Sequence, residues 1–198
     1  MATVLALSPP PAMPQKRFSV AEYHRLIADG YFACDERYEL VRGYIIERPP
    51  INPPHATVVR KLMVQLLRLV GLTAVVRIQL SITLPDGEPI PDFVLAAGTD
   101  DDYAARHPGP DDCHLVIEVS DSSVAFDTGA KLATYAQAKV SVYWVVNIPD
   151  RRVEVYTQPR GGKSPTYRTR TDYAPGQDVS VVVAGKTLGS LPVSELLP

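Results

Sequence analysis

The chain has 198 residues, a formal net charge of -2 at pH 7 and 45% hydrophobic residues. This length and composition indicate one globular domain with a substantial core, and no apolar run approaches the length of a membrane span. The near-neutral charge excludes a polycation, so any contact with nucleic acid must come from a local basic patch.

The cysteines and the N-terminal segment bear on where the protein acts. Cys34 and Cys113 lack the spacing of a metal site, which favours reduced thiols in a cytoplasmic protein. The segment from Met1 to Lys16 is rich in proline and lacks the charged start and apolar core of a signal peptide. We therefore predict a flexible arm over residues 1–16 and a single domain over residues 17–198.

The first predicted elements are a short helix and a β-hairpin. Ser19 and Glu22 have the spacing of a capping box, and Gly30 follows Asp29 where a helix would end. The segment 38–48 predicts a hairpin that turns at Arg42-Gly43. Glu39, at the start of this hairpin, has by itself the pattern of a solvated acid at a strand edge.

A rigid, proline-rich connector leads into a second predicted helix, which runs from His55 to Val70. Its apolar residues share one stripe at helical spacing: Val58, Val59, Leu62, Met63, Leu66, Leu67 and Val70. His55 lies in the first turn. It is either an ordinary polar residue at a helix start or a residue that faces a phosphate or a metal-bound water.

Two strands and a turn are predicted next. The segment 73–84 alternates apolar and polar residues, which is typical of a half-buried strand. Pro85-Asp86-Gly87 predicts a turn. The apolar run 90–95 then contains one acid near its start, Asp92. The acid-rich segment 99–112 that follows lacks the spacing of a calcium loop, so we predict a solvated loop.

The segment 113–147 predicts strand, turn, helix and strand. Its first apolar run carries one carboxylate, Glu118, and a polar turn follows at residues 120–123. Helical spacing extends over 125–139, and a second apolar run extends over 140–148. A carboxylate in a strand buried on both faces is costly unless it is paired or holds a metal, so Glu118 requires an explanation.

The C-terminal part predicts a charged hairpin and an apolar end. The hairpin, with strands at 151–157 and 166–173, has more arginines than acids. We favour an ordinary charged hairpin over a contact with phosphates. The segment 178–198 is short-stranded and apolar, which indicates either a sheet edge being closed or a dimer contact over Val179 to Leu197.

Asp92 and Glu118 lie on two apolar strands that are candidates to be neighbours in one sheet. Two adjacent carboxylates repel each other unless a cation lies between them. Mg²⁺ prefers oxygen ligands and typically uses one or two carboxylates.

At this point the motifs resemble a known family. They are similar to a bacterial restriction endonuclease family of the PD-(D/E)XK nuclease superfamily, in the branch whose catalytic lysine lies on the helix after the glutamate strand. The resemblance extends from Phe18 to about Tyr156. It depends on the order and spacing of these residues: Phe18 to Tyr23, Arg37 to Gly43, Pro54-His55, Pro91-Asp92, Glu118-Val119-Ser120, Lys131 and Tyr143-Trp144.

The resemblance implies a fold and a chemistry. The expected fold is α/β and restriction-endonuclease-like, with a mixed central β-sheet flanked by α-helices. The expected activity is a Mg²⁺-dependent DNA endonuclease, with Mn²⁺ as a substitute. The implied catalytic residues are Glu39, Asp92, Glu118 and Lys131, the implied substrate-binding residue is His55, and the implied metal ligands are Asp92, Glu118 and the carbonyl of Val119.

Lys131 has a second interpretation. Asp127 precedes it by four residues, so Asp127 either holds a catalytic Lys131 in position or forms an ordinary surface salt bridge with it.

Three functions remain open. The first is the DNA endonuclease, acting as a homodimer because two strands must be cut. The second is a catalytically silent module that binds DNA or protein. The third is a metal-dependent hydrolase of another phosphodiester. The presence of Glu39, Asp92, Glu118 and Lys131 together favours the first.

Overall fold

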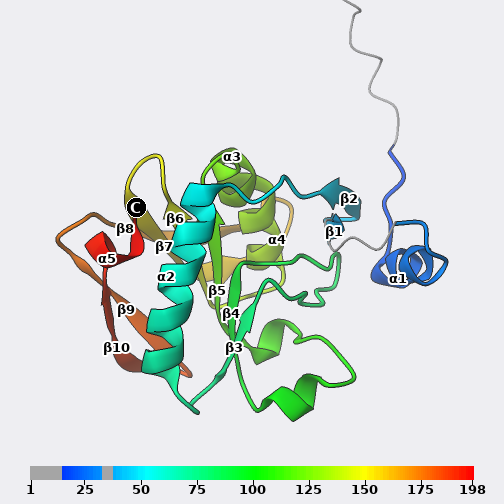
Figure 1. The fold of residues 1–198 in the computed structure, drawn as a ribbon. Coiled ribbons are helices and arrows are strands. Elements are labelled where there is room, and N and C mark those ends of the chain that lie inside the picture. The colour runs from blue at the N-terminus through cyan, green and yellow to red at the C-terminus, as the bar shows by residue number, and fades with distance from the viewer. Residues whose placement is uncertain (1–14, 33–37) are drawn as a thin grey trace, which may run out of the picture.

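A computed structural model describes residues 15–32 and 38–198. Its centre is a six-stranded sheet in the order β3-β4-β5-β6-β7-β8 (Figure 1). The strands are β3 (Val75–Ile78), β4 (Phe93–Ala96), β5 (Cys113–Ser120), β6 (Val142–Asn147), β7 (Arg152–Arg160) and β8 (Thr166–Tyr173). β5 and β6 run parallel and the other neighbours antiparallel, which confirms the expected mixed sheet.

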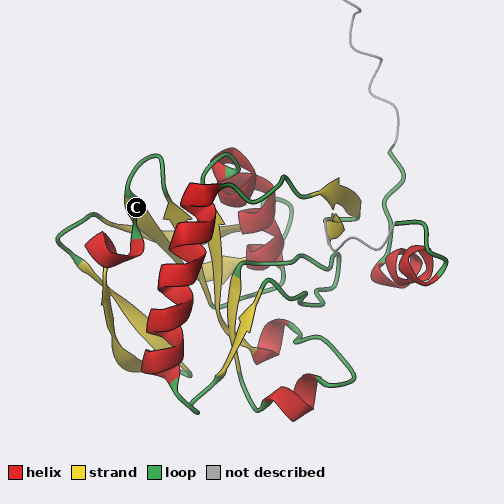
Figure 2. Ribbon diagram, in the orientation of Figure 1, coloured by secondary structure: helices red, strands yellow, loops and turns green. Residues whose placement is uncertain are grey.

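Helices cover both faces of this sheet (Figure 2). The long helix α2 (Pro53–Val70) lies on one face. The other face is covered by one continuous helical segment, made of α3 (Val124–Phe126), the π-helical turn η3 (Asp127–Lys131) and α4 (Leu132–Gln137). This segment links the parallel strands β5 and β6, as parallel neighbours require. The predicted order of strand, turn, helix and strand is therefore confirmed.

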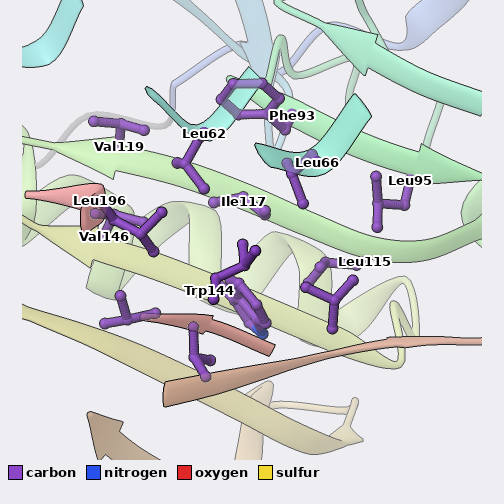
Figure 3. Packing of buried hydrophobic residues seen from close by; sticks show 14 of the residues in the cluster. Leu62, Leu66, Phe93, Leu95, Leu115, Ile117, Val119, Trp144, Val146 and Leu196 are labelled. Carbon is purple, nitrogen blue, oxygen red and sulfur yellow. The ribbon is translucent and has the colours of Figure 1, made fainter. Parts of the chain in front are cut away.

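The larger core lies between α2 and the sheet (Figure 3). Leu62 and Leu66 of α2 are fully buried, as the predicted apolar stripe requires. They pack with alternate residues of the strands, among them Ile117 and Trp144. The intervening residues of β5 point to the opposite face, so Glu118 faces the helix α4 instead of the main core.

The C-terminal segment packs onto α2 in the same chain. It forms a separate two-stranded sheet of β9 (Asp178–Val183) and β10 (Lys186–Pro192), followed by α5 (Val193–Leu196). Its apolar residues Val179, Val181, Leu191 and Leu196 are buried in the larger core. The apolar side chains that suggested a dimer contact over Val179 to Leu197 are therefore already covered within the chain, and the dimer itself stays a prediction.

The predicted strand 73–84 is also wrong in its length. β3 ends at Ile78, because Gln79 adopts a left-handed backbone conformation with φ 51°. Beyond that residue the alternation of faces breaks, and Leu80 is 45% exposed whereas Ile82 is fully buried. The following segment 99–112 contains two short 3-10 helices, Asp100–Tyr103 and Pro110–Asp112.

The N-terminal elements follow the prediction. α1 (Val20–Ala28) begins with the capping box of Ser19 and Glu22, and Gly30 ends it with a positive φ. β1 (Tyr38–Val41) and β2 (Tyr44–Glu47) form the hairpin that turns at Arg42-Gly43. Cys34 and residues 1–14 of the predicted arm lie outside the described residues, so the arm and the single domain remain predictions.

The charged hairpin of β7 and β8 neutralises much of its own charge. Arg152 Nε lies 2.9 Å from Glu154 Oε1, and Arg170 Nε lies 2.6 Å from Asp172 Oδ1. These contacts support the prediction of an ordinary charged hairpin. Across the described ranges of the chain, helices long and apolar enough to cross a membrane are absent.

The β1–β2 hairpin pairs with the backbone next to Gly87. Glu88 pairs with Leu40 through two backbone hydrogen bonds, and a Cβ at Gly87 would lie 2.5 Å from the carbonyl oxygen of Leu40. We expect Gly87→Ala to lower the free energy of unfolding by about 1–3 kcal/mol, because the backbone must move to relieve this clash. Chemical denaturation measures the change. Gly129→Ala, where a Cβ meets nothing within 4 Å, is the matched control, and equal stability of the two variants would contradict the prediction.

Candidate active site

A pocket of about 280 Å³ lies at the end of the sheet where β5 finishes. The N-terminus of α2, the β1–β2 hairpin and the turn before α3 form its walls. All six residues proposed from the sequence for catalysis, substrate binding or metal ligation line it: Glu39, His55, Asp92, Glu118, Val119 and Lys131. Residues far apart in sequence are thus brought together at one place.

Adjacent strands bring Asp92 and Glu118 together. Phe93 of β4 pairs with Ile117 of β5 in antiparallel register, which sets Asp92 across from Glu118. Opposed residues of antiparallel strands point to the same face, so both carboxylates lie on one side of the sheet. The prediction that Asp92 and Glu118 are neighbours in one sheet is therefore confirmed.

Three groups hold the carboxylate of Asp92, which is 2% exposed. The backbone N–H of Val119 donates to Oδ2 at 2.8 Å, and His55 Nε2 lies 3.2 Å from the same oxygen. The side chain of Gln79 donates to Oδ1 at 3.2 Å. Burial would raise the pKa of Asp92, but these contacts, with His55 foremost, hold it below its ordinary value. Asp92 is therefore a buried, ionised acid.

Glu118 and Glu39 share a buried cation. Lys131 Nζ lies 2.9 Å from Glu118 Oε1 and 3.1 Å from Glu39 Oε2, and Lys131 is only 4% exposed. The hydroxyl of Tyr135, one helical turn further, donates to Glu118 Oε1 at 2.6 Å. The backbone N–H of Ile90 donates to Glu39 Oε2 at 2.9 Å. Two acids from separate elements therefore converge on one ammonium group.

The protonation of this cluster follows from burial and charge. Burial raises the pKa of Glu118 to about 8, against the opposing effect of the Lys131 cation, and the nearby acids add to the rise. Burial alone would lower the pKa of Lys131, but Glu118 and Glu39 outweigh it and raise that pKa above its ordinary value. Lys131 therefore stays protonated at neutral pH.

Asp127 does not hold Lys131 as predicted. Its Oδ2 accepts hydrogen bonds from the hydroxyls of Ser120 and Ser123, each at 2.6 Å. Burial raises the pKa of Asp127, and the Lys131 cation and these hydroxyls only partly oppose it. The alternative of a surface salt bridge is wrong as well, because Lys131 is buried and pairs with Glu39 and Glu118.

Sequence reasoning missed several residues that support the site. Tyr135 carried a signal, because it follows Lys131 by four residues and so lies on the same helical face. Asn52 is the N-cap of α2: its side-chain oxygen Oδ1 accepts from the His55 N–H at 3.0 Å, and its side-chain Nδ2 donates to Asp121 Oδ2 at 2.6 Å. Asn52 thereby ties the helix that carries His55 to the end of β5.

Gln79 gave no signal in the sequence, because its approach to Asp92 depends on an unusual backbone conformation.

The donors in the pocket can be compared with what a divalent metal needs. The described residues contain no group of three or more histidines, cysteines and acids arranged to hold a metal ion. Asp92 and Glu118 instead offer two carboxylates side by side, with the backbone of Val119 next to them. Mg²⁺ commonly takes only one or two carboxylates and fills its other positions with water and substrate phosphates. The donor set therefore fits Mg²⁺ and does not fit a closed site made of protein alone.

Similar proteins have the same fold. A crystal structure of "a putative nuclease belonging to DUF820" from Anabaena variabilis superposes with a TM-score of 0.69 at 14% sequence identity. The match covers 90% of this chain and 97% of that one, and at this identity it shows the shared fold. Among curated protein sequences, none matches the chain significantly.

A family model covers nearly the whole of the described chain. It is Uma2, with the description "Putative restriction endonuclease", and it matches residues 20–189. The matched range contains the complete pocket, including the acids that surround Lys131. The chain therefore belongs to the Uma2 family, a restriction-endonuclease-like family of nucleases.

Proposed function

We propose that the protein is a Mg²⁺-dependent DNA endonuclease that hydrolyses phosphodiester bonds in the pocket at the end of β5. One observation carries this proposal: Glu39, Asp92 and Glu118 line one pocket, in which the buried ammonium of Lys131 pairs with Glu39 and Glu118. Buried charges are costly, and such a cluster is typical of a catalytic site. A DNA substrate also agrees with the cytoplasmic setting that the sequence predicts.

Asp92, Glu118 and the carbonyl of Val119 would hold the metal. When bound, Mg²⁺ supplies a Lewis acid for the phosphoryl oxygens and lowers the pKa of bound water. The hydrogen bonds from Val119 N–H and Gln79 fix the orientation of Asp92 before any metal arrives. Tyr135 fixes Glu118 in the same way. The two ligands are thereby pre-organised on rigid strands.

Lys131 would act on the attacking water or on the transition state. An ammonium group has three N–H donors. Glu118 and Glu39 take two of them, which leaves one donor for an oxygen of the water or of the phosphate. A positioned cation in a dry pocket stabilises developing negative charge strongly. Glu39 orients this cation and is also available to a second metal ion, directly or through water.

His55 would support substrate binding from the α2 side of the pocket. Its Nε2 contacts Asp92, while its Nδ1 is buried and has no hydrogen-bond partner among the described residues. Arg48 also lines the pocket, with Nη2 3.9 Å from Asp92 Oδ1. Arg48 thus places positive charge, and His55 a ring nitrogen, where a scissile phosphate would enter.

The silent module and the hydrolase of another phosphodiester are less well supported. A binding module has no use for a buried lysine between two carboxylates, which costs stability unless the charges are needed. The groups in the pocket alone do not distinguish DNA from another phosphodiester. Plasmid DNA as substrate therefore tests the proposal directly.

The two proposed metal ligands give the first test. We expect Asp92→Ala and Glu118→Ala to abolish Mg²⁺ binding in calorimetry and nicking of supercoiled plasmid, with Mn²⁺ substituting for Mg²⁺ in the unmodified protein. Asp101→Ala, in the solvated acidic segment, is the control and should bind metal and cut normally. Metal binding and nicking that survive Asp92→Ala would refute the nuclease proposal.

Lys131 gives a different expected result. Lys131→Ala should still bind Mg²⁺ and DNA, because Lys131 is no metal ligand, while single-turnover cleavage falls roughly a hundredfold to ten-thousandfold. Lys131→Arg should restore little activity, since a planar fork does not replace a compact ammonium between two acids. Circular dichroism confirms that each variant is folded. Cleavage by Lys131→Ala at the unmodified rate would remove Lys131 from the mechanism.

We also propose a homodimer, because each chain supplies one active site and a duplex has two strands to cut. The apolar side chains of the C-terminal segment are buried within the chain, so we expect other surfaces to form the contact. We expect sedimentation velocity at micromolar concentration to give a species of two chains, and plasmid cleavage to produce linear DNA with few nicked intermediates. A monomer that only nicks would contradict the dimer and leave the nuclease proposal intact.

A further inference from the structure

We propose that a groove on the β1–β2 hairpin holds the phosphate backbone of one DNA strand as it leaves the catalytic pocket. This inference rests on the proposed endonuclease function and adds to it where the strand is bound. The hairpin groove has a volume of about 330 Å³. Its lining residues are Arg17, Val41, Arg42, Tyr44, Ile46, Phe126 and Ala130.

The hairpin groove adjoins the catalytic pocket. Ile46 and Phe126 line both of them, and Ala130 of the groove directly precedes Lys131 of the pocket. Alternate residues of a strand point to the same side, so Tyr44 and Ile46 of β2 share one face. That face continues to Arg48, which lies in the pocket. A strand with its scissile phosphate in the pocket would therefore reach the groove with an adjoining phosphate.

Two arginines, Arg17 and Arg42, give the hairpin groove a positive charge that is available to a ligand. Among the described residues, no acid lies within 4.0 Å of the charged group of Arg17 or Arg42, so neither forms an ion pair with a described acid. Arg152 and Arg170 of the β7–β8 hairpin, by contrast, are paired with acids. Glu39 and Glu118 of the adjoining pocket pair with Lys131. Unpaired arginines beside a phosphodiester-cleaving pocket are suited to bind backbone phosphates.

The position of Arg17 is fixed by the hairpin itself. The N–H of Phe18 donates to the carbonyl of Gly43 at 2.8 Å. A Cβ at Gly43 would lie 2.8 Å from the Cβ of Arg17, so the glycine permits this close approach. The guanidinium of Arg17 lies 5.4 Å from the centre of the Tyr44 ring. Arginine on an aromatic platform is a combination that single-strand binding surfaces use.

The arrangement favours a polynucleotide over a small phosphodiester. The catalytic pocket has cations of its own, Lys131 and Arg48, for one phosphate. A molecule that fills this pocket does not reach Arg17 or Arg42, whose side chains line the separate groove. Only a substrate with several phosphates along a chain occupies both the catalytic pocket and the hairpin groove.

The test measures binding of a fluorescent 12-nucleotide single-stranded DNA to the full chain by anisotropy, in EDTA to prevent cleavage. The variants are Arg17→Ala, Arg42→Asn and the two combined. Asparagine is chosen at position 42 because the residue has φ 52° and asparagine tolerates that conformation. Arg68→Ala, exposed in the last turn of α2, is the matched control.

We expect each single variant to weaken binding about fivefold at 0.1 M salt and the double variant about twenty-five-fold, since each phosphate contact with a single strand contributes about 0.7 to the slope of log affinity against log salt. That slope should fall by about 0.7 for each arginine removed. The Arg68→Ala control should keep the affinity and slope of the unmodified chain. Thermal melting checks the turn at Arg42, and Arg17→Ala leaves that turn untouched.

The outcomes separate this inference from the proposed function. Equal binding by the double variant and by Arg68→Ala overturns the inference, even if the unmodified chain nicks plasmid. Loss of binding in the groove variants supports it. If the unmodified chain then fails to nick plasmid with Mg²⁺ or Mn²⁺, the nuclease proposal falls while the binding groove stands.

Discussion

The ammonium of Lys131 between two buried carboxylates is the interaction on which the site depends. Glu118 belongs to the central sheet and Glu39 to the β1–β2 hairpin, so this one cation joins two separate parts of the fold. Without it, two carboxylates would remain in a dry environment and repel each other. A buried cluster of charged side chains costs folding free energy, so stability alone does not account for it. The geometry is therefore best understood as a charge arrangement prepared for a further cation and an anionic substrate.

The parallel pair β5–β6 explains how Lys131 reaches that place. A parallel pair needs a connection that crosses one face of the sheet, and here it is the helical segment α3–η3–α4. The side chains of β5 that point to this face include Glu118. The crossover thus brings Lys131 and Tyr135 onto the acid by topology alone. The π-helical turn contains Lys131, and such turns occur often at functional sites.

Much of the fold could be predicted from sequence because hydrophobic periodicity reports local structure. It identified α2, the β5–helix–β6 unit and the hairpin at Arg42-Gly43. Asp92 and Glu118 were found because an acid within an apolar run is out of place there. The shortened β3 could not be predicted, since one left-handed residue, Gln79, broke an otherwise regular alternation. The partners of Lys131 were misjudged for a related reason: Asp127 is near in sequence, whereas Glu39 is near only after folding.

The separation between sheet and hairpin has a consequence for how such a protein can diverge. Asp92 and Glu118 are positioned by the strands of the central sheet, so moving either of them requires moving the sheet. The β1–β2 hairpin is a two-stranded sheet of its own, attached through Leu40 and Glu88 and through Lys131. Arg42 and Tyr44 of this hairpin, and Arg17 packed beside it, lie outside the hydrophobic core clusters. In the proposed nuclease, selection can therefore alter which nucleic acids are bound by changing this one appendage, while the proposed hydrolytic centre beneath it is inherited unchanged.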